Sequence, residues 1–361
     1  MIAPTLQMEF GARQVPVYLG HDLITHSAIL SRHIHGQHVV IVTQENIAAL
    51  HLAKLHSALG DFHCDTILLP AGEQHKNLTQ WQKILDTLVE LQQDRSVTLI
   101  ALGGGVVGDI TGFAAACYLR GVHYLQIPTT LIAQVDAALG GKTAVNHPAG
   151  KNLVGVFYQP QCVIADINLL QTLPDREYFA GFAEVIKYGL AFDYDFFVWL
   201  EQNVAALVSK APAELLYAVR KSAQIKAQVV TQDEHDHGLR NFLNFGHTIG
   251  HVLETYGDYQ KLLHGEAVAL GMLLASRLSV QLQGLPQASV DRVKKLLSAF
   301  HLPVTIELPP LSDLMELLQR DKKVRAGKMK FILLSAIGSA LQTTAVTAAD
   351  IETLLTLVSC A

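Results

Sequence analysis

The order of hydrophobic and polar positions divides the chain into two parts that differ in period. Up to residue 173, short hydrophobic runs alternate with longer segments in which hydrophobic residues recur at helical spacing. Short strands that alternate with helices favour a parallel, doubly wound sheet. The expected strands are His38–Thr43, Cys64–Leu69, Val97–Leu102, Tyr124–Ile127 and Val163–Asp166, and the expected helices are one that starts at Asp22, then Glu45–Leu59, Leu78–Gln92 and Val106–Leu119.

The beginning and the second half of the chain depart from this alternation. Thr5–Phe10 and Gln14–Leu19 lie on either side of a short Gly-Ala-Arg turn, which is typical of a hairpin. From Pro174 onward the pattern is helical, apart from a strand-like run at Phe331–Leu334, and a proline suits the first turn of a helix. We therefore expect an α/β domain over residues 1–173 and an all-α domain over residues 174–361.

The composition is that of a compact globular protein with little charge bias. Half of the residues are hydrophobic, 16% are charged, and the formal net charge is −5. This balance excludes a disordered chain and gives no electrostatic reason to expect a nucleic acid or an anionic membrane as a partner. An anionic small substrate would therefore need a local cluster of lysines and arginines.

Neither the cysteines nor the apolar stretches indicate a secreted or membrane protein. Cys64, Cys117, Cys162 and Cys360 are scattered without a C-x-x-C spacing, so we expect no disulfide framework and no thiolate zinc site. The opening MIAPTLQMEF lacks the basic and apolar regions of a secretory signal, and the longest apolar stretches are interrupted by Gly, Asp, Arg or Ser. A cytoplasmic location is expected.

Four polar residues between positions 240 and 251 recur at helical spacing. Arg240, Asn244, His247 and His251 are separated by four, three and four residues, which predicts one stripe of a single, otherwise apolar helix. Burying these groups is costly unless a ligand or a metal satisfies them. The stripe therefore indicates a site for a metal and an anionic substrate, with His264 at the start of the next helix. The alternative is chance, because the chain has 17 histidines.

A glycine-rich turn follows the strand expected at Val97–Leu102. The segment GGGVVGD, from Gly103 to Asp109, matches G-x-G-x-x-G between a strand and a helix, where helix N–H groups can bind a pyrophosphate. It differs from the usual dinucleotide fingerprint, because it follows a middle strand and because Pro128 stands where an acidic residue would contact the ribose. A glycine-lined close contact between helix and strand is the other interpretation.

Further loops combine glycines with lysines. The segment Pro70–Lys76 ends a strand, where ligands often bind a parallel sheet, but taken by itself it fits an ordinary solvated turn better. Pro128–Asp136, Gly140–Asn146 and Lys151-Asn152 offer backbone donors and cations. We favour phosphate binding over a flexible surface loop there, because the positions around the polar residues are apolar.

Taken together, these segments resemble those of the 3-dehydroquinate synthases. The matching runs are GGGVVGD, RGVHYLQIPTTLIAQVDAALGGKTAVNHPAGKN, FAEVIKYG, LNFGHTIGH, HGEAVALGM and DKKVRAGKMKFIL, which occur in the order of that family. The resemblance implies a Rossmann-like NAD-binding α/β domain, a helical domain that binds metal and substrate, and an active site in the cleft between them. It also implies a homodimer.

The resemblance implies a ligand set for a divalent metal, either zinc or cobalt. It assigns Glu184, His247 and His264 as ligands, in place of the His247–His251 pair that spacing alone suggests, and it makes His251 a substrate or proton-relay contact. Two histidines and one carboxylate leave coordination positions open for a substrate. By itself, Glu184 would be taken for a surface carboxylate paired with Lys187.

The resemblance also implies NAD contacts at the ends of the expected strands. One departure is the sequence Gln44-Glu45-Asn46, where the family often has an acid earlier in the loop, so the contact with the adenosine ribose stays open. The implied NAD-contacting residues are Gly72, Glu73, Gln74, His75, Lys76, Gly105, Val106, Val107, Gly108, Asp109, Thr129, Thr130, Lys142, Lys151, Leu169, Leu170, Gln171 and Thr172.

The implied substrate is 3-deoxy-D-arabino-heptulosonate 7-phosphate, and the implied products are 3-dehydroquinate and phosphate. The expected course is transient oxidation of C5 by NAD, β-elimination of phosphate, return of the hydride, ring opening and aldol closure, with the metal polarising the C5 hydroxyl. The implied binding residues are Arg120 (across a dimer interface in relatives), Lys142, Asn152 and Lys330 for the phosphate, Lys226, Arg240 and Asn244 for the carboxylate and C2 end, and Asp136, Lys187 and His251 for the hydroxyls.

Other functions share parts of this pattern. A metal- and NAD-dependent polyol or glycerol dehydrogenase would take a small neutral substrate, which leaves the conspicuous Lys and Arg residues without a purpose. Another sugar-phosphate cyclase, one that makes an inosose or a valiolone, would share the cofactor and metal motifs. A nucleotide-binding scaffold without catalysis is disfavoured by the intact metal trio.

Overall fold

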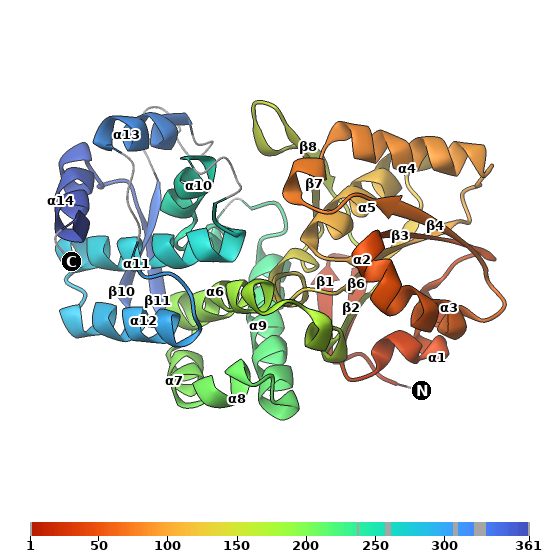
Figure 1. The fold of residues 1–361 in the computed structure, drawn as a ribbon, viewed down its shortest axis with the longest axis horizontal. Coiled ribbons are helices and arrows are strands. Elements are labelled where there is room, and N and C mark those ends of the chain that lie inside the picture. Colours follow the sequence, from red (N-terminus) through yellow and green to blue (C-terminus); the bar gives the residue numbers. More distant parts are fainter. Residues whose placement is uncertain (1, 237, 257–260, 306–309, 321–329, 360–361) are drawn as a thin grey trace. The chain divides into compact units, whose positions relative to one another are not determined.

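The computed structural model describes residues 2–236, 238–256, 261–305, 310–320 and 330–359. The chain forms two compact units. The first consists of Met1–Pro174 with Leu215–His235, and the second of Asp175–Glu214 with Asp236–Ala361. Figure 1 labels the elements of both units along the colour gradient of the chain.

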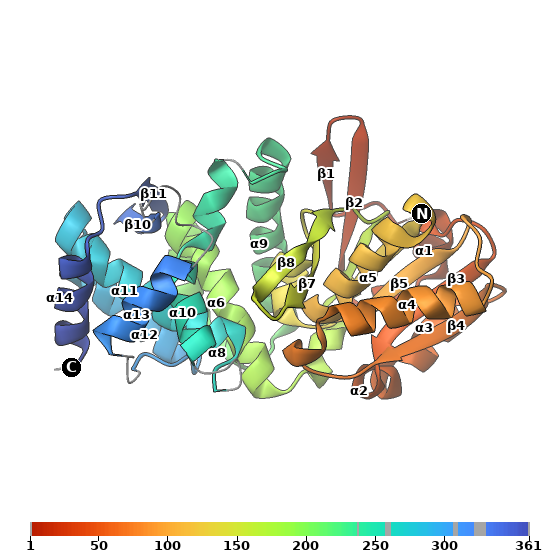
Figure 2. The same cartoon turned by 90° about the horizontal axis from the view of Figure 1, so that it is seen from above.

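A seven-stranded sheet forms the centre of the first unit (Figure 1). Its strands are β1 (Leu6–Phe10), β2 (Arg13–Gly20), β3 (His38–Gln44), β4 (His63–Leu69), β5 (Thr98–Gly103), β6 (His123–Pro128) and β9 (Val163–Asp166). They lie in the order β1-β2-β9-β6-β5-β3-β4. Only β1 pairs antiparallel with its neighbour, and all other pairs are parallel. The hairpin and the parallel strands expected from the sequence are therefore confirmed. The β1–β2 hairpin stands out at one edge of the sheet in Figure 2.

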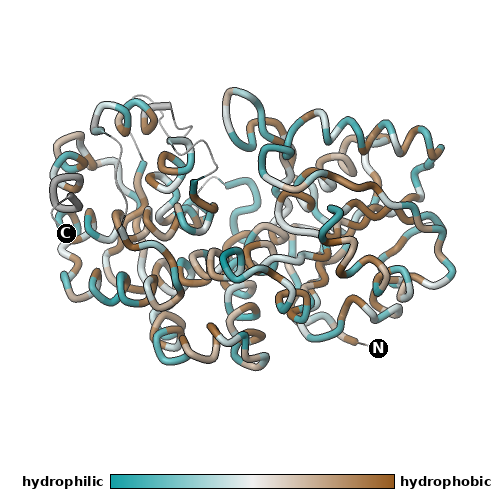
Figure 3. The backbone as a smooth tube through the Cα atoms, in the orientation of Figure 1, coloured by the Kyte–Doolittle hydropathy of each residue, from teal (hydrophilic) through white to brown (hydrophobic). Residues whose placement is uncertain are grey.

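Helices cover both faces of this sheet, because successive residues of a strand point to opposite faces. Val39 and Ile41 belong to one hydrophobic core, whereas Val40 and Val42 belong to another. The first core includes residues of α1 (Ser27–His33) and α3 (Ala53–Leu59), and the second includes residues of α4 (Leu78–Glu90) and α5 (Gly105–Cys117). In Figure 3 the strands between these helices are coloured mostly hydrophobic. The remaining helical segments are η1 (Leu23–Thr25), α2 (Glu45–Ile47), η2 (Ala48–Leu52), η3 (Glu73–His75), η4 (Tyr118–Arg120), η5 (Ala133–Ala137), η6 (Ile167–Thr172) and α9 (Pro212–Gln232).

A second hairpin lies where the hydrophobic pattern suggested no strand. Strands β7 (Lys142–His147) and β8 (Gly150–Phe157) pair antiparallel. Most residues of β8 are exposed. A strand that buries neither face leaves no alternation of hydrophobic and polar residues in the sequence, which explains why periodicity missed it.

Helix α11 (His264–Gln283) is the centre of the second unit. It is buried along most of its length, as expected for an apolar helix without a continuous polar face. It contacts α6 (Asp175–Phe192), α10 (His247–Tyr256), α12 (Gln287–Ala299), α14 (Ala348–Ser359) and strand β10 (Phe331–Ala336). The other elements are α7 (Tyr194–Gln202), α8 (Val204–Val208), η7 (Leu239–Asn244), α13 (Leu311–Arg320) and β11 (Ser339–Thr343). Within the described residues, no helix combines the length and apolarity needed to cross a bilayer.

The helical prediction for the second half is confirmed, with a short hairpin added to it. The strand expected at Phe331–Leu334 is β10, which pairs antiparallel with β11. The hairpin is joined to α11 because the N–H group of Leu334 donates to Ser279 Oγ at 2.9 Å. Periodicity alone hardly distinguishes a strand as short as β10 from a buried helical segment.

The polar stripe expected from Arg240 to His251 lies on two helices rather than one. Arg240 and Asn244 belong to η7, whereas His247 is the first residue of α10. Gly246 between them has a φ of +81°, a left-handed conformation that glycine adopts without strain and that turns the chain. The prediction of a single stripe was therefore wrong, because helical spacing places residues on one face only while the helix is continuous.

Candidate functional site

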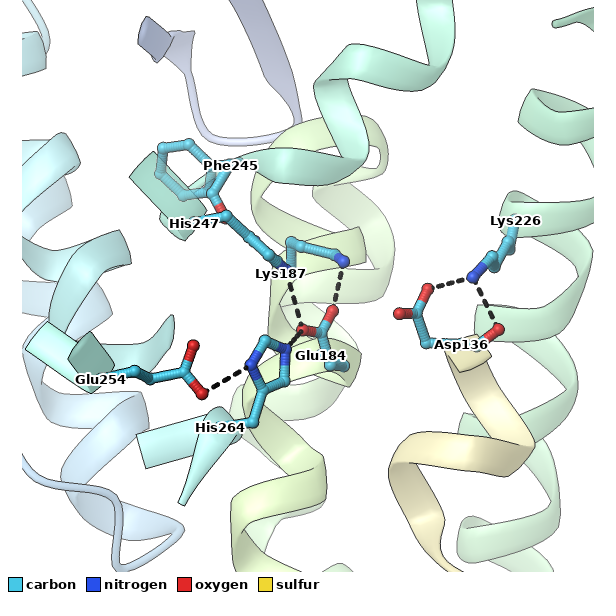
Figure 4. Close-up of polar contacts among 8 residues, drawn as sticks. All are labelled: Asp136, Glu184, Lys187, Lys226, Phe245, His247, Glu254 and His264. Carbon is cyan, nitrogen blue, oxygen red and sulfur yellow. Dashed lines mark hydrogen bonds and ion pairs between the residues drawn. The ribbon is translucent and has the colours of Figure 1, made fainter. Parts of the chain in front are cut away.

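Glu184, His247 and His264 converge from α6, α10 and α11 (Figure 4). The Oε1 atom of Glu184 lies 3.4 Å from Nε2 of His247 and 3.4 Å from Nε2 of His264. One ligand atom from each residue lies within 4.8 Å of the other two. Ligands bound to one tetrahedral zinc ion at about 2.0–2.2 Å are separated from each other by about 3.4 Å. The observed spacing therefore fits a divalent metal.

Glu184 is held as a buried anion. Its side chain is fully buried, and the ammonium of Lys187, also buried, forms an ion pair with it. Burial alone would raise the pKa of Glu184, but Lys187 and His247 lower it well below its usual value. A surface carboxylate paired with Lys187 was the alternative for Glu184 taken by itself; the pair is present, but the carboxylate is buried. An ionised carboxylate in the protein interior is a suitable metal ligand.

Glycine residues allow α10 and α11 to approach closely enough to bring the two histidines together. Gly271 of α11 lies against Gly246, and a Cβ atom on Gly271 would overlap the Gly246 carbonyl oxygen. The first turn of α11 is fixed by Glu266, whose Oε2 atom accepts the N–H group of Leu263 at 2.8 Å. His264, as the first residue of that helix, is thereby placed opposite α10.

Each histidine of the trio has a partner at its other ring nitrogen. The Nδ1 atom of His247 lies 3.2 Å from the carbonyl oxygen of Phe245, and the Nδ1 atom of His264 lies 3.3 Å from Oε1 of Glu254. Burial lowers the pKa of His247. Burial alone would also lower the pKa of His264, but the carboxylates of Glu184 and Glu254 raise it to about 10. The two carboxylates therefore stabilise positive charge at the His264 ring.

Glu254 is a site residue that the sequence interpretation missed. It lies on α10, three residues after His251 and seven after His247, and this spacing places all three on one side of the helix. That spacing was the available signal. The carboxylate of Glu254 also contacts His264, which belongs to the next helix, α11. A contact between helices leaves no mark in the spacing of a single helix, so the sequence did not reveal it.

The other candidate substrate residues of the second unit include some on α10, on η7 and just before β10. The ring centroid of His251 is 5.4 Å from that of His247 and 6.2 Å from that of His264. Arg240 is buried, and Asn244 is half-buried, on η7, which contacts α6. Lys330 lies just before β10 and is half-buried, and the basic segment that precedes it, residues 321–329, is outside the described residues.

Most of the expected NAD-contacting residues of the first unit follow the carboxyl ends of strands in the seven-stranded sheet. Parallel strands place their carboxyl ends at the same edge, which is the usual place for ligands in such sheets. Gly72 to Lys76 follow β4, Gly105 to Asp109 follow β5, Thr129 and Thr130 follow β6, and Leu169 to Thr172 form most of η6 after β9. The structure thus brings together four segments that are distant in the sequence.

The loop after β4 is tied to the glycine-rich turn by Lys76. This lysine is 5% exposed, and its Nζ atom forms an ion pair with Asp109 and donates to Oδ1 of Asn152 at 2.6 Å. Burial alone would lower the pKa of Lys76, but Asp109 and Glu73 raise it. The loop is therefore not the ordinary solvated turn that the segment by itself suggested, and that interpretation was wrong.

The glycine-rich turn itself has the two features that the sequence suggested as alternatives. Helix α5 begins at Gly105, and no side chain caps its first turn, so its backbone donors can serve an anion. Gly108 lies against the side chain of Gln126 in β6, where a Cβ atom would come within 2.8 Å of the amide oxygen. Close helix–strand packing and phosphate binding are compatible uses of one such turn.

The remaining polar candidates of the first unit are found on η5, β7, β8 and α9. Lys226 of α9 is buried, forms an ion pair with Asp136, and donates to the carbonyl oxygen of Asp136 at 2.6 Å (Figure 4). Lys142 begins β7 and is exposed, whereas Lys151 on β8 is half-buried. Asn152 joins this group through Lys76.

Arg120 lies at the opposite end of the sheet from the glycine-rich turn. It ends η4, just before β6 begins, and therefore lies near the amino end of that strand. The glycine-rich turn follows the carboxyl end of β5. Helix α5, with 13 residues and a length of about 20 Å, runs between the two edges. The exposed Arg120 side chain is consequently remote from the glycine-rich turn.

Comparison with known proteins gives consistent matches along the chain. Family models described as 3-dehydroquinate synthase N-terminal and C-terminal match residues 66–180 and 181–324. A 3-dehydroquinate synthase from Shewanella loihica is 49% identical over 339 residues, which cover 93% of this chain and 94% of that protein. One from Colwellia psychrerythraea is 48% identical over 336 residues, with coverages of 93% and 95%.

A solved structure extends the comparison to three dimensions. The 2-epi-5-epi-valiolone synthase of Streptomyces hygroscopicus subsp. jinggangensis, solved with NAD⁺ and Zn²⁺ bound, has a TM-score of 0.88 with this chain at 28% identity. The match covers 99% of both chains. The chain therefore shares the fold of this valiolone synthase over 99% of its length.

Proposed function

This chain belongs to the 3-dehydroquinate synthase family, and we propose on that premise that Glu184, His247 and His264 hold the metal of its active site. The enzyme converts 3-deoxy-D-arabino-heptulosonate 7-phosphate into 3-dehydroquinate and phosphate, a step of the shikimate pathway. Its cofactors are NAD and a divalent metal, zinc or cobalt. When bound, they supply transient oxidation at C5 of the substrate and polarisation of the C5 hydroxyl.

The observation that carries the proposal is the convergence of one buried carboxylate and two imidazoles from three helices. Their ligand atoms lie within 4.8 Å of one another. Two histidines and a carboxylate form the protein part of many catalytic zinc sites, which keep further positions for water or substrate. Lys187 keeps Glu184 ionised, and His251 lies beside the trio, where it can contact a substrate hydroxyl.

NAD binding is proposed for the edge of the sheet in the first unit. The first turn of α5 would bind the pyrophosphate through backbone N–H groups, because an anion is stabilised at a helix N-terminus. Lys76 holds the loop after β4 against Asp109 of that turn. The segments after β6 and β9 would complete the contacts through Thr129, Thr130 and Leu169–Thr172. These segments share one edge, as a single dinucleotide requires.

The anionic ends of the substrate explain why buried cations occur in a chain of net charge −5. Lys226 and Arg240 are both buried, and we assign them, with Asn244, to the carboxylate and C2 end. Lys142, Asn152 and Lys330 are assigned to the phosphate. Asp136 orients the ammonium of Lys226 through two oxygen atoms and is assigned, with Lys187 and His251, to the hydroxyls. Holding both ends would keep the reacting carbons in register through elimination and ring closure.

Arg120 is assigned to the phosphate site of a second subunit in a homodimer. It lies near the amino end of β6, at the opposite end of the sheet from the glycine-rich turn. Exposure leaves its guanidinium accessible to a partner. We propose that the enzyme works as a cytoplasmic homodimer.

The test is turnover by metal-replete protein with NAD and the heptulosonate phosphate. Phosphate release and 3-dehydroquinate formation are measured before chelation, after chelation, and after zinc or cobalt is added back. Activity should disappear with the metal and return with it. Glu184→Ala and His264→Ala should each weaken metal binding by more than about 100-fold, beyond the range seen when an outer partner of a ligand is removed. Both variants should lose turnover.

A matched control separates the site from general damage to the second unit. Glu201 is a carboxylate of the same unit that binds Arg292 rather than a histidine. Glu201→Ala should retain metal and turnover. Normal turnover by Glu184→Ala or His264→Ala would show that the metal ligands are misassigned.

Testing other substrates in the same experiment distinguishes this activity from those of related enzymes. A polyol dehydrogenase would accumulate NADH with glycerol, whereas a synthase of this family regenerates NAD and shows no net reduction. Because a valiolone synthase shares the fold, a second cyclase activity should also be tested. Sedoheptulose 7-phosphate and glucose 6-phosphate should therefore give no cyclised product. Turnover of either in preference to the heptulosonate would contradict the proposed substrate.

A further inference from the structure

We propose that Glu254 is a positioning residue of the metal site, whose carboxylate holds the imidazole of His264 so that its Nε2 atom faces Glu184 (Figure 4). This inference rests on the proposed function, because it presupposes a metal held by Glu184, His247 and His264. It goes beyond the ligand set by naming the residue that orients one ligand.

The imidazole of His264 lies between two carboxylates that come from different helices. Its Nε2 atom is 3.4 Å from Oε1 of Glu184 on α6, and its Nδ1 atom is 3.3 Å from Oε1 of Glu254 on α10. A histidine that binds a metal through Nε2 carries its proton on Nδ1, and that proton needs an acceptor. Glu254 provides the acceptor, so it selects the tautomer and the ring orientation that metal binding requires.

The two histidines of the site differ in what holds them. The Nδ1 atom of His247 faces the carbonyl oxygen of Phe245, 3.2 Å away and two residues earlier in the chain. The backbone of its own segment therefore orients that ring. His264 is the first residue of α11, and its Nδ1 partner comes from another helix. Its orientation thus depends on a side chain that can be replaced, which makes the inference testable.

The burial of Glu254 supports a role at the site. It is 3% exposed and follows the hydrophobic residues Val252 and Leu253 on α10. Burying a carboxylate is costly unless charged or hydrogen-bonding partners compensate. The contact with His264 is such a compensation, and it places negative charge next to a ring that would donate electrons to a metal.

Glu254 could also act as a metal ligand, and this alternative has to be distinguished from its role as an acceptor for His264. Ligand atoms of His251, Glu254 and His264 also lie within 4.8 Å of one another, so this cluster could hold a second metal ion. Both metals would then share His264, whose two ring nitrogens would have to give up their protons. A single metal needs only one deprotonated nitrogen. The geometry therefore favours Glu254 as an acceptor over Glu254 as a ligand.

The experiment compares Glu254→Gln and Glu254→Met in the full-length protein. Gln keeps an acceptor oxygen of nearly the same reach and removes the charge, whereas Met removes both. Zinc affinity is measured by competition with a chelator, metal stoichiometry by elemental analysis, and ligand geometry by the absorption spectrum of the Co²⁺-loaded protein. We expect one metal per chain, a loss of affinity of about 10- to 100-fold for Glu254→Met with an altered Co²⁺ spectrum, and a smaller loss for Glu254→Gln.

Controls distinguish the possible failures. Glu201→Gln alters a carboxylate of the same unit that pairs with Arg292, and it should keep the affinity and spectrum of the unaltered protein. Zinc affinity and a Co²⁺ spectrum in both Glu254 variants equal to those of the unaltered protein would overturn the inference, whatever their thermal stability. A second metal per chain that is lost in Glu254→Met would also overturn it. If Glu184→Ala binds zinc as tightly as the unaltered protein, the ligand set itself is wrong, which is a separate result.

Discussion

Arg176 donates hydrogen bonds from Nε and Nη2 to the two carboxylate oxygens of Glu266, at 2.7 and 2.8 Å. Arg176 is in the first turn of α6, and Glu266 is in the first turn of α11. The pair therefore joins the beginnings of the two helices that carry Glu184 and His264. Because Glu266 also accepts the N–H group of Leu263, it links this ion pair to the start of the helix at His264.

Arg176→Ala should weaken zinc binding several-fold while lowering the free energy of unfolding by only about 1 kcal/mol, since Arg176 is largely exposed. Zinc competition and urea unfolding measure the two effects. Arg292→Ala is the matched control, because Arg292 forms the same kind of bidentate ion pair with Glu201, which is not a metal ligand. An equal loss of zinc affinity in that control would mean that Arg176 has no particular link to the site.

Gly271→Ala should destabilise the second unit by about 1–3 kcal/mol or more, because the added methyl group would overlap the backbone of Gly246 and force α10 and α11 apart. The same displacement should separate His247 from His264 and weaken zinc binding. Urea unfolding and chelator competition test both expectations. At Gly20 a Cβ atom would meet Leu23 at an ordinary 3.6 Å, so Gly20→Ala should leave zinc affinity unchanged.

Lys76→Met should weaken NAD binding at least about ten-fold and lower the free energy of unfolding by about 3 kcal/mol. The substitution leaves Asp109 next to the glycine-rich turn without its cation, and removing one partner of a buried ion pair is strongly destabilising. Calorimetric titration with NAD and urea unfolding give the two values. The exposed Lys83 donates to the carbonyl oxygen of Leu68 and not to a carboxylate in the described residues, so Lys83→Met should be nearly neutral. Unaltered NAD affinity in Lys76→Met would argue against the proposed nucleotide site.

Acidification should destabilise the first unit through His51. Burial, aided by Lys54, lowers the pKa of this histidine, whose Nε2 atom lies 3.0 Å from Oγ1 of Thr172. Below the unfolded pKa of about 6.5 the unfolded chain takes up a proton that the folded chain resists, so stability falls as pH falls. The slope for one proton is at most about 1.4 kcal/mol per pH unit. Unfolding of His51→Gln between pH 5 and 8 should show a shallower slope, and an unchanged slope would exclude His51 as the cause.

Much of the fold was predictable because its elements are constrained by burial. The strands around Val39–Val42 and Thr98–Leu102 are hydrophobic on both faces, and the helices between them show a clear helical period. Strand β8 buries little, so its residues follow no period, and the pattern did not reveal it. The break at Gly246 was also missed, because a single glycine is compatible with either a turn or a helix.

The candidate site was predictable to the extent that its residues belong to recognisable motifs. The resemblance named Glu184, His247 and His264 together, and in the structure their ligand atoms lie within 4.8 Å of one another. Spacing alone suggested His247 with His251, because it reports only neighbours on the same helix. Glu254 and Arg176 belong to no motif that we recognised, and both act across helix boundaries.

By itself, then, the sequence determined the order of the elements, the two-part division of their pattern and the family to which the chain belongs. These follow from local periodicity and from motifs of contiguous residues. Only the tertiary structure decided which groups meet: His264 with Glu254, Lys76 with Asp109, and Arg176 with Glu266. The physical reason is that such contacts depend on how closely backbones pack, as Gly271 allows for α10 and α11, and packing distance is a property of two elements rather than of either one.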